Sequence, residues 1–142
     1  MVYIGIDPDS DRSGVVILKD GKLEKKMLGL FELEKYLLTF RDTVSKYLVV
    51  IEKGELNKRL FNAVKMPKRV GLKVAAGIGK NFMITDLLID FCEIFKITYE
   101  TYTPRTKKLD SKEMKLLTGM EKSNQEIRDA FRCVQKYYRG EV

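Results

Sequence analysis

Residues 4–18 have the sequence IGIDPDSDRSGVVIL, in which two apolar runs flank an acidic turn. Val2, Ile4 and Ile6 occupy alternate positions, a pattern that predicts a β-strand with one apolar face, ending at Asp7. The turn PDSD follows, and the run GVVIL predicts a second strand over residues 14–18. Apolar packing gives no reason for a carboxylate at the end of such a strand, so Asp7 is the first candidate functional residue.

Beyond these two strands, the chain alternates between strand and helix patterns. We predict further strands over residues 22–28, 48–51 and 97–103, and helices over residues 31–46, 74–95, 112–117 and 123–138. The run LVVI at 48–51 is wholly apolar and mostly β-branched, which is typical of a central strand buried on both faces, and Glu52 follows it directly.

The remaining segment, residues 53–72, is basic, contains Pro67 and Gly71, and is expected to be only partly helical. The order of the main elements is βββ-α-β-α-β-α. This order predicts an α/β fold in which helices flank a five-stranded mixed sheet, built as one domain over residues 1–142.

The chain has 142 residues, of which none is histidine and two are cysteine. The absence of histidine excludes Ser-His-Asp and Cys-His catalysis, HExxH metalloproteases and histidine-based nucleases. Cys92 and Cys133 form no CxxC pair, so we expect buried free thiols rather than a zinc site. An enzyme of this composition would depend on carboxylates, lysines or hydroxyls, and carboxylates are natural ligands of Mg²⁺ and Mn²⁺.

The net charge is +7, and the basic residues are concentrated in two stretches. Residues 53–81 contain eight basic residues and one acid, and residues 105–122 contain six basic residues and three acids. Such concentration favours binding of a nucleic-acid backbone, although a solvated lysine-rich surface is the alternative. The candidate backbone contacts are Lys53, Lys58, Arg59, Lys65, Lys68, Arg69, Lys80, Lys107, Lys108, Lys112, Lys115 and Lys122.

Four acids are candidates for one shared site. If the strands that end at Asp7 and Glu52 are adjacent and parallel, both carboxylates emerge at the same edge of the sheet. Glu126 and Asp129 lie three residues apart on the last predicted helix and so share one side of it. Four clustered carboxylates repel one another unless cations occupy the site, and two divalent ions would make it a two-metal phosphodiesterase centre.

The two strand-end acids also have structural alternatives. Asp7 is in the position to form an Asx turn within DPDSD. Glu52 is alternatively an ordinary strand-end acid near Lys53. Neither alternative requires a metal.

The two helix acids have alternatives as well. Ser123 and Glu126 have the spacing of a capping box, a role that is compatible with metal binding. Asp129 is alternatively a surface acid that pairs with Arg132. The small side chain of Ala130, next to Asp129, would let this helix approach the sheet closely.

Four segments occur in the order and spacing of one known family: IGIDPDSDRSGVVIL at 4–18, VVIE at 49–52, AAGIGKNF at 75–82 and KSNQEIRDAF at 122–131. Together they resemble the RuvC family of Holliday junction resolvases, the last segment in the form of its phage-type members. The resemblance implies an RNase H-like fold, with Asp7, Glu52, Glu126 and Asp129 as ligands of two Mg²⁺ ions, for which Mn²⁺ substitutes. The position of Glu126 is usually aspartate or histidine in that family.

The resemblance further implies a homodimer that resolves four-way junctions or other branched DNA by metal-dependent hydrolysis, leaving a 5′ phosphate and a 3′ hydroxyl. A non-catalytic nucleic-acid-binding module and a nuclease for RNA–DNA hybrids are the alternatives on the same fold. No apolar run approaches the roughly 20 residues of a membrane span, and the acids Asp7, Asp9 and Asp11 interrupt any signal peptide. We therefore expect a cytoplasmic protein of a bacterial or phage-infected cell, with no membrane partner.

Overall fold

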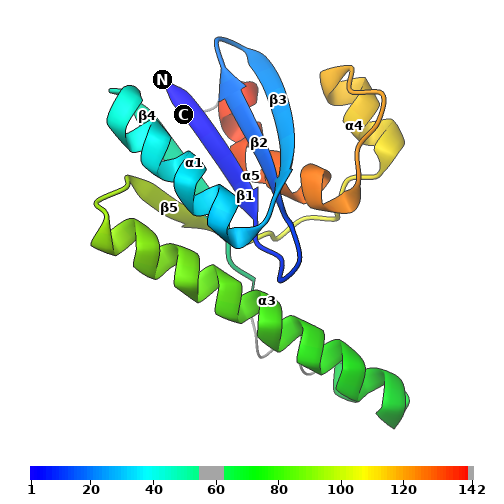
Figure 1. The fold of residues 1–142 in the computed structure, drawn as a ribbon. Helices are drawn as coiled ribbons and strands as arrows, with labels where there is room; N and C mark the ends of the chain where they lie inside the picture. Colours follow the sequence, from blue (N-terminus) through cyan, green and yellow to red (C-terminus); the bar gives the residue numbers. More distant parts are fainter. Residues whose placement is uncertain (55–62, 141–142) are drawn as a thin grey trace.

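The computed structural model describes residues 1–54 and 63–140. Its centre is a five-stranded sheet in the order β3-β2-β1-β4-β5 (Figure 1). The strands are β1 (Val2–Asp7), β2 (Ser13–Lys19), β3 (Lys22–Leu28), β4 (Tyr47–Glu52) and β5 (Tyr99–Tyr102). The first three form an antiparallel meander, whereas β4 runs parallel to β1 and β5 parallel to β4. The predicted five-stranded mixed sheet is confirmed, and the strands that end in Asp7 and Glu52 are adjacent and parallel, which is the condition for a shared site.

Helices cover both faces of this sheet. They are α1 (Leu30–Thr43), α3 (Lys68–Ile94), α4 (Ser111–Thr118) and α5 (Gln125–Tyr138). Figure 1 shows α1 and α3 on one face and α5 on the other, with the first half of α3 extending past the sheet. The short helix α4 packs next to α5 through the buried Met114.

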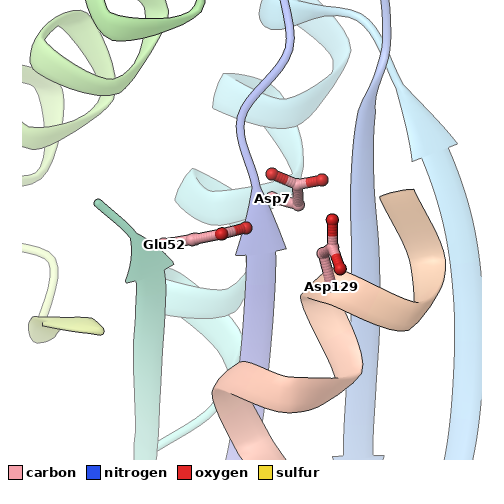
Figure 2. Close-up of side chains that lie close together, drawn as sticks. All are labelled: Asp7, Glu52 and Asp129. Atoms are coloured by element: carbon pink, nitrogen blue, oxygen red, sulfur yellow. The ribbon is translucent and has the colours of Figure 1, made fainter. Parts of the chain in front are cut away.

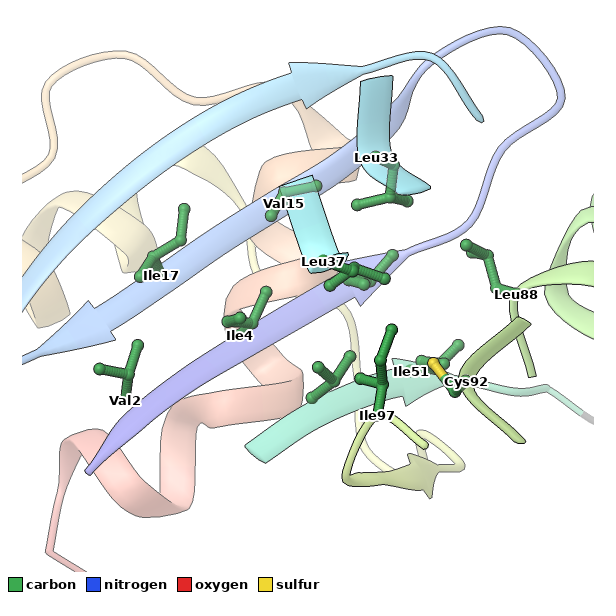
Figure 3. Close-up of a cluster of buried hydrophobic side chains, with 12 residues drawn as sticks. Val2, Ile4, Val15, Ile17, Leu33, Leu37, Ile51, Leu88, Cys92 and Ile97 are labelled. Carbon is green, nitrogen blue, oxygen red and sulfur yellow. The ribbon is translucent and has the colours of Figure 1, made fainter. Parts of the chain in front are cut away.

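Two apolar cores form because the central strands are apolar on both faces. The first core joins alternate residues of β1, β2 and β4, such as Ile4 and Val15, to Leu33 and Leu37 of α1 and to Leu88 of α3 (Figure 3). The second core joins the opposite face, including Val16 of β2, to Phe131 and its neighbours on α5. Burial of this much apolar side chain on both faces stabilises the layered arrangement.

The helix α5 lies unusually close to the sheet. A Cβ atom placed on Gly5 would overlap the carbonyl oxygen of Ala130, and one placed on Gly14 would overlap that of Glu126. Because glycine has no Cβ, the backbone of α5 can pack directly against the strand backbone at Gly5 and Gly14. The close approach predicted from Ala130, itself fully buried, is confirmed, and the glycines opposite make it possible.

Several element boundaries differ from the predictions. The helix α3 begins at Lys68 rather than at residue 74, because Pro67 is its N-cap and Gly71 lies inside it. Proline is well tolerated at the start of a helix, and Gly71 is buried where a Cβ atom would overlap the carbonyl oxygen of Ala63. The helix α5 begins at Gln125 rather than at residue 123, and β5 is shorter than the strand predicted over 97–103.

Two smaller predictions concern cysteines and membranes. Cys92 and Cys133 are both buried and both free thiols, as predicted. Among residues 1–54 and 63–140, no helix combines the length and the apolar character that crossing a membrane requires.

Candidate metal centre

Three carboxylates from distant parts of the chain converge at one edge of the sheet. Asp7 ends β1, Glu52 ends the neighbouring parallel strand β4, and Asp129 lies on the second turn of α5. Figure 2 shows the three side chains pointing toward one another. One carboxylate oxygen from each residue lies within 4.8 Å of the other two, a spacing that suits a shared metal ion.

Burial makes this cluster electrostatically costly in the absence of a cation. The exposed fractions of Glu52 and Asp129 are only 6% and 5%. Burial of Asp7, its hydrogen bond with Glu52 and the charges of Glu52 and Asp129 together raise the pKa of Asp7 to about 9, against an opposing effect of Lys108. The raised pKa of Asp7 therefore keeps a proton on the cluster at neutral pH in the absence of a cation.

The side chain of Asp129 is held by two neighbours. Its Oδ1 accepts a hydrogen bond of 2.7 Å from Nε2 of Gln125, one turn earlier on α5. Its Oδ2 lies 3.5 Å from Nζ of Lys108, which comes from the segment between β5 and α4. The alternative in which Asp129 pairs with Arg132 is wrong, because Arg132 donates instead to the carbonyl oxygen and the hydroxyl of Thr106.

The structure also contradicts the turn alternative for Asp7. The Asx turn in DPDSD is made by Asp9, whose Oδ2 accepts from the backbone N–H of Asp11 at 3.2 Å. The carboxylate of Asp7 instead faces Glu52. Lys53, the neighbour invoked for Glu52, extends its ammonium group to within 4.0 Å of Asp86.

Glu126 lies at the rim of the cluster rather than within it. It lines the same pocket of about 180 Å³ as Asp7, Glu52 and Asp129, but it is not one of the three acids whose oxygens meet within 4.8 Å. The capping box predicted for Ser123 and Glu126 is wrong. The N-cap is Asn124, whose Oδ1 accepts from the N–H of Ile127 at 2.8 Å, so capping does not occupy the carboxylate of Glu126.

Other lining residues of the pocket were not predicted. Asn81 of α3 lines it, and its Oδ1 accepts from the backbone N–H of Ser10 at 3.0 Å, which ties α3 to the turn after Asp7. Gln125 was missed although its position four residues before Asp129 is a helical contact distance. The four-residue spacing could therefore have predicted the contact of Gln125 with Asp129. The contact of Asn81 with Ser10 could not be predicted in this way, because it depends on how α3 crosses the sheet.

The predicted backbone-binding residues occupy several places. On the first half of α3, the exposed predicted residues are Lys68, Arg69 and Lys80. Lys80 is next in sequence to Asn81, which lines the pocket. Exposed residues on the other basic stretch are Lys107, Lys108, Lys112, Lys115 and Lys122. Lys53 and Lys65 are exposed as well, whereas Lys58 and Arg59 lie outside the described residues.

Two of these lysines have specific neighbours. Lys115 pairs with Glu121 at 3.3 Å. Lys122 lies with Lys25 and Lys26 around a separate hollow of about 380 Å³, and its carbonyl oxygen accepts a hydrogen bond from the ammonium group of Lys25.

No protein-family model matches the chain, and comparison with curated protein sequences gives no match either. Solved structures do match. A structure titled as Thermus thermophilus RuvC in complex with a Holliday junction substrate is 11% identical, with a TM-score of 0.58. A second Thermus thermophilus RuvC structure is 12% identical, with a TM-score of 0.53. Each alignment covers 99% of this chain and 95% of the other. The chain therefore has the α/β, RNase H-like fold of RuvC, as predicted.

Proposed function

We propose that this chain is a metal-dependent endonuclease that cuts branched DNA, four-way junctions above all, and leaves a 5′ phosphate and a 3′ hydroxyl. The observation that carries the proposal is the convergence of Asp7, Glu52 and Asp129 within 4.8 Å at the edge of the sheet. The shared fold adds support, because one structure with this fold is of a resolvase bound to a Holliday junction.

The donors at the site fit hard divalent cations. The candidate ligands at the site are carboxylates, and the chain has no histidine. Cys133 is buried, and burial and the nearby acids raise the pKa of its thiol well above the usual value. Oxygen ligands of this kind suit Mg²⁺ and Mn²⁺. Asp7, Glu52 and Asp129 would hold the ions, with Glu126 as a fourth ligand from the same pocket. Two bound ions supply an activated water and charge stabilisation at the leaving oxygen.

The other residues of the site have positioning and binding roles in this proposal. Gln125 fixes the orientation of Asp129 through its hydrogen bond. Because the raised pKa of Asp7 reflects a retained proton, ion binding releases that proton, and the affinity for the ion increases with pH. The exposed basic residues on the first half of α3 and near α4 would hold the DNA backbone on either side of the pocket.

We propose a homodimer as the active assembly, with α3 as its interface. Large apolar side chains recur at helical spacing along one side of α3 and are exposed: Leu72, Met83, Leu87 and Ile94. Two copies packed about a two-fold axis would bury each apolar stripe against the other.

A cleavage assay with three substrates tests the proposed activity. A synthetic four-way junction, a linear duplex of the same sequence and an RNA–DNA hybrid are each incubated with Mg²⁺ or Mn²⁺. We expect cleavage of the junction in preference to both others. Preferential cleavage of the hybrid would instead identify a hybrid nuclease, and binding without cleavage of any substrate would identify a non-catalytic module.

Variants connect the activity to the site. Asp7→Asn should abolish cleavage yet preserve junction binding, because an amide is nearly isosteric with the carboxyl group but a poorer metal ligand. Asp11→Asn is the matched control, since it neutralises an exposed acid in the same turn that does not line the pocket. Wild-type turnover by the Asp7→Asn variant would overturn the assignment.

A further inference from the structure

The segment between β5 and α4 is clamped to α5 by two arginines. The guanidinium of Arg132, which is buried, donates to the carbonyl oxygen of Thr106 at 2.6 Å and to its hydroxyl at 2.9 Å. One turn earlier on α5, Nε of Arg128 donates to the carbonyl oxygen of Leu109 at 3.0 Å. These two anchors lie on either side of Lys108, so the segment that carries Lys108 is fixed to the helix that carries Asp129.

A connected set of polar contacts runs from this clamp into the metal centre. Nη2 of Arg128 donates to Oε1 of Gln125 at 3.1 Å, and Gln125 in turn donates to Oδ1 of Asp129. The other oxygen of Asp129 faces the ammonium group of Lys108 at 3.5 Å. Both oxygens of the Asp129 carboxylate are thus oriented by groups whose own positions the two arginines fix.

The ion pair between Lys108 and Asp129 differs from an ordinary surface pair. The side chain of Lys108 is 62% exposed, whereas that of Asp129 is only 6% exposed. Exposed pairs contribute little because water screens both charges and two mobile side chains must be ordered. Here water scarcely reaches the carboxylate, and the backbone of the lysine is already held in place. The ammonium group therefore balances a charge that solvent cannot balance.

We propose that Lys108 is a built-in counter-cation for the metal-free centre, which a divalent ion displaces from Asp129 when it binds. This inference rests on the proposed function, since it assumes that Asp129 is a metal ligand. The ammonium group and the ion carry charges of the same sign and compete for the same carboxylate. Lys108 consequently stabilises the empty centre and weakens ion binding, and Arg128 and Arg132 act as positioning residues for it.

Binding of Mn²⁺ in the absence of DNA tests the proposal by isothermal titration calorimetry at low salt. Lys108→Met removes the charge and keeps most of the side-chain volume, and it should tighten Mn²⁺ binding by about fivefold or more, the range of typical coupling between two sites. Lys108→Arg keeps the charge and should bind Mn²⁺ within about twofold of wild type. Unchanged or weaker binding by Lys108→Met would overturn the proposal.

Lys107→Met is the matched control. Lys107 is the neighbouring residue on the same clamped segment and is exposed, but it does not line the pocket. Its replacement removes the same net charge and should tighten Mn²⁺ binding far less than Lys108→Met does. Equal tightening in both variants would mean that net charge alone acts, and the proposal would fail.

Thermal unfolding gives a second readout. Without metal, Lys108→Met should be less stable than wild type, and saturating Mn²⁺ should remove most of that difference, because the ion replaces the missing charge. A stability loss that persists with Mn²⁺ would indicate a purely structural role. If wild type itself binds no Mn²⁺, the proposed function fails; if wild type binds Mn²⁺ and Lys108→Met binds it equally, only this inference fails.

Discussion

The helices α5 and α3 cover opposite faces of the same sheet but meet it in different ways. The backbone of α5 lies directly on Gly5 and Gly14, and its buried side includes the charged residue Asp129. The helix α3 contacts the first core through side chains such as Leu88 and Cys92 in its second half, and its first half extends past the sheet (Figure 1). A helix whose backbone packs directly on the sheet can hold a carboxylate at a fixed position. A helix that contacts the sheet only through side chains covers a core and keeps its outer surface exposed.

The largest expected effect comes from displacing α5 from the sheet, which would change both the stability of the fold and the position of Asp129. A Cβ on Gly5 would overlap the backbone of Ala130, which has no flexible end to move aside, so Gly5→Ala should destabilise the fold by about 3 kcal/mol. The displaced helix would also move Asp129 away from Asp7. We expect a lower urea midpoint together with weaker Mn²⁺ binding in whatever protein remains folded.

The matched control for this change lies on α3. Gly77 is exposed within α3, and a Cβ there would meet no atom within 4 Å. Gly77→Ala should therefore stabilise the protein by up to about 1 kcal/mol, because alanine favours a helix over glycine. Loss of stability in both variants would contradict the distinction between the two helices.

The second prediction concerns how stability depends on pH, because Asp129 on α5 is buried next to Asp7 and raises its pKa. With a folded pKa of about 9 against an ordinary value of 3.8, Asp7 contributes its full stability below about pH 4. Between these values the folded state keeps a proton that the unfolded state has released, so the stability of the fold falls as pH rises. Above about pH 9 the contribution is gone.

Urea unfolding in EDTA from pH 5 to 9 measures this slope. Asp7→Asn should flatten the curve relative to wild type, since the amide does not ionise. Asp90→Asn, which neutralises an exposed acid on α3, should leave the wild-type slope in place. Identical slopes for wild type and Asp7→Asn would contradict the raised pKa.

The third prediction tests the free surface of α3. Leu87→Glu places a charge in the proposed apolar interface and should convert a dimer to a monomer in analytical ultracentrifugation, with little change in the unfolding of the fold itself. Leu116→Glu is the control, because Leu116 is also an exposed leucine, at 87% against 44% for Leu87, but it lies on α4. A dimer that persists with Leu87→Glu would move the interface elsewhere.

The smallest effect is expected from the basic turns at the start of α3. Replacing Lys68 and Arg69 by alanine should reduce the slope of log K against log salt for junction binding by roughly 0.9 for each phosphate that the protein no longer neutralises. Folding stability should change by less than about 0.5 kcal/mol, because both side chains are exposed.

Lys19→Ala with Lys46→Ala is a control of equal charge at the opposite end of the sheet from Asp7. An unchanged slope in the Lys68 and Arg69 variant would place the DNA path along Lys107, Lys112 and Lys115 instead.

The sequence was sufficient to find the strand-borne part of the site. Asp7 and Glu52 stand at the ends of apolar runs, and the edge at which parallel strands end is a property of backbone geometry alone. Asp129 followed from the helical pattern of residues 123–138. These predictions depended on local periodicity, which a sequence displays directly.

Interactions that depend on tertiary packing were not predictable in this way. Lys108 was assigned to DNA binding, and its position against Asp129 depends on arginine hydrogen bonds with the segment before α4. The start of α5 was misplaced because Ser123 and Asn124 are both good N-caps, and the chain uses the second. The local preferences of the two residues are nearly equal, so the sequence alone did not decide between them.

The origin of the three acids in residues 7, 52 and 129 has a consequence for the life of the polypeptide. A ribosome that has made the first two strands and β4 has produced two of the acids, but a chain that stops before α5 lacks the third. It also lacks Ile127, Phe131 and the rest of the second core, so the sheet edge that holds Asp7 and Glu52 would have one face uncovered. Proteolysis between α4 and α5 would separate α5, and with it Asp129, from the rest of the chain. If the chain has the proposed phosphodiesterase activity, an unfinished or clipped chain is therefore expected to lack it, and the activity would begin only once α5 has been made.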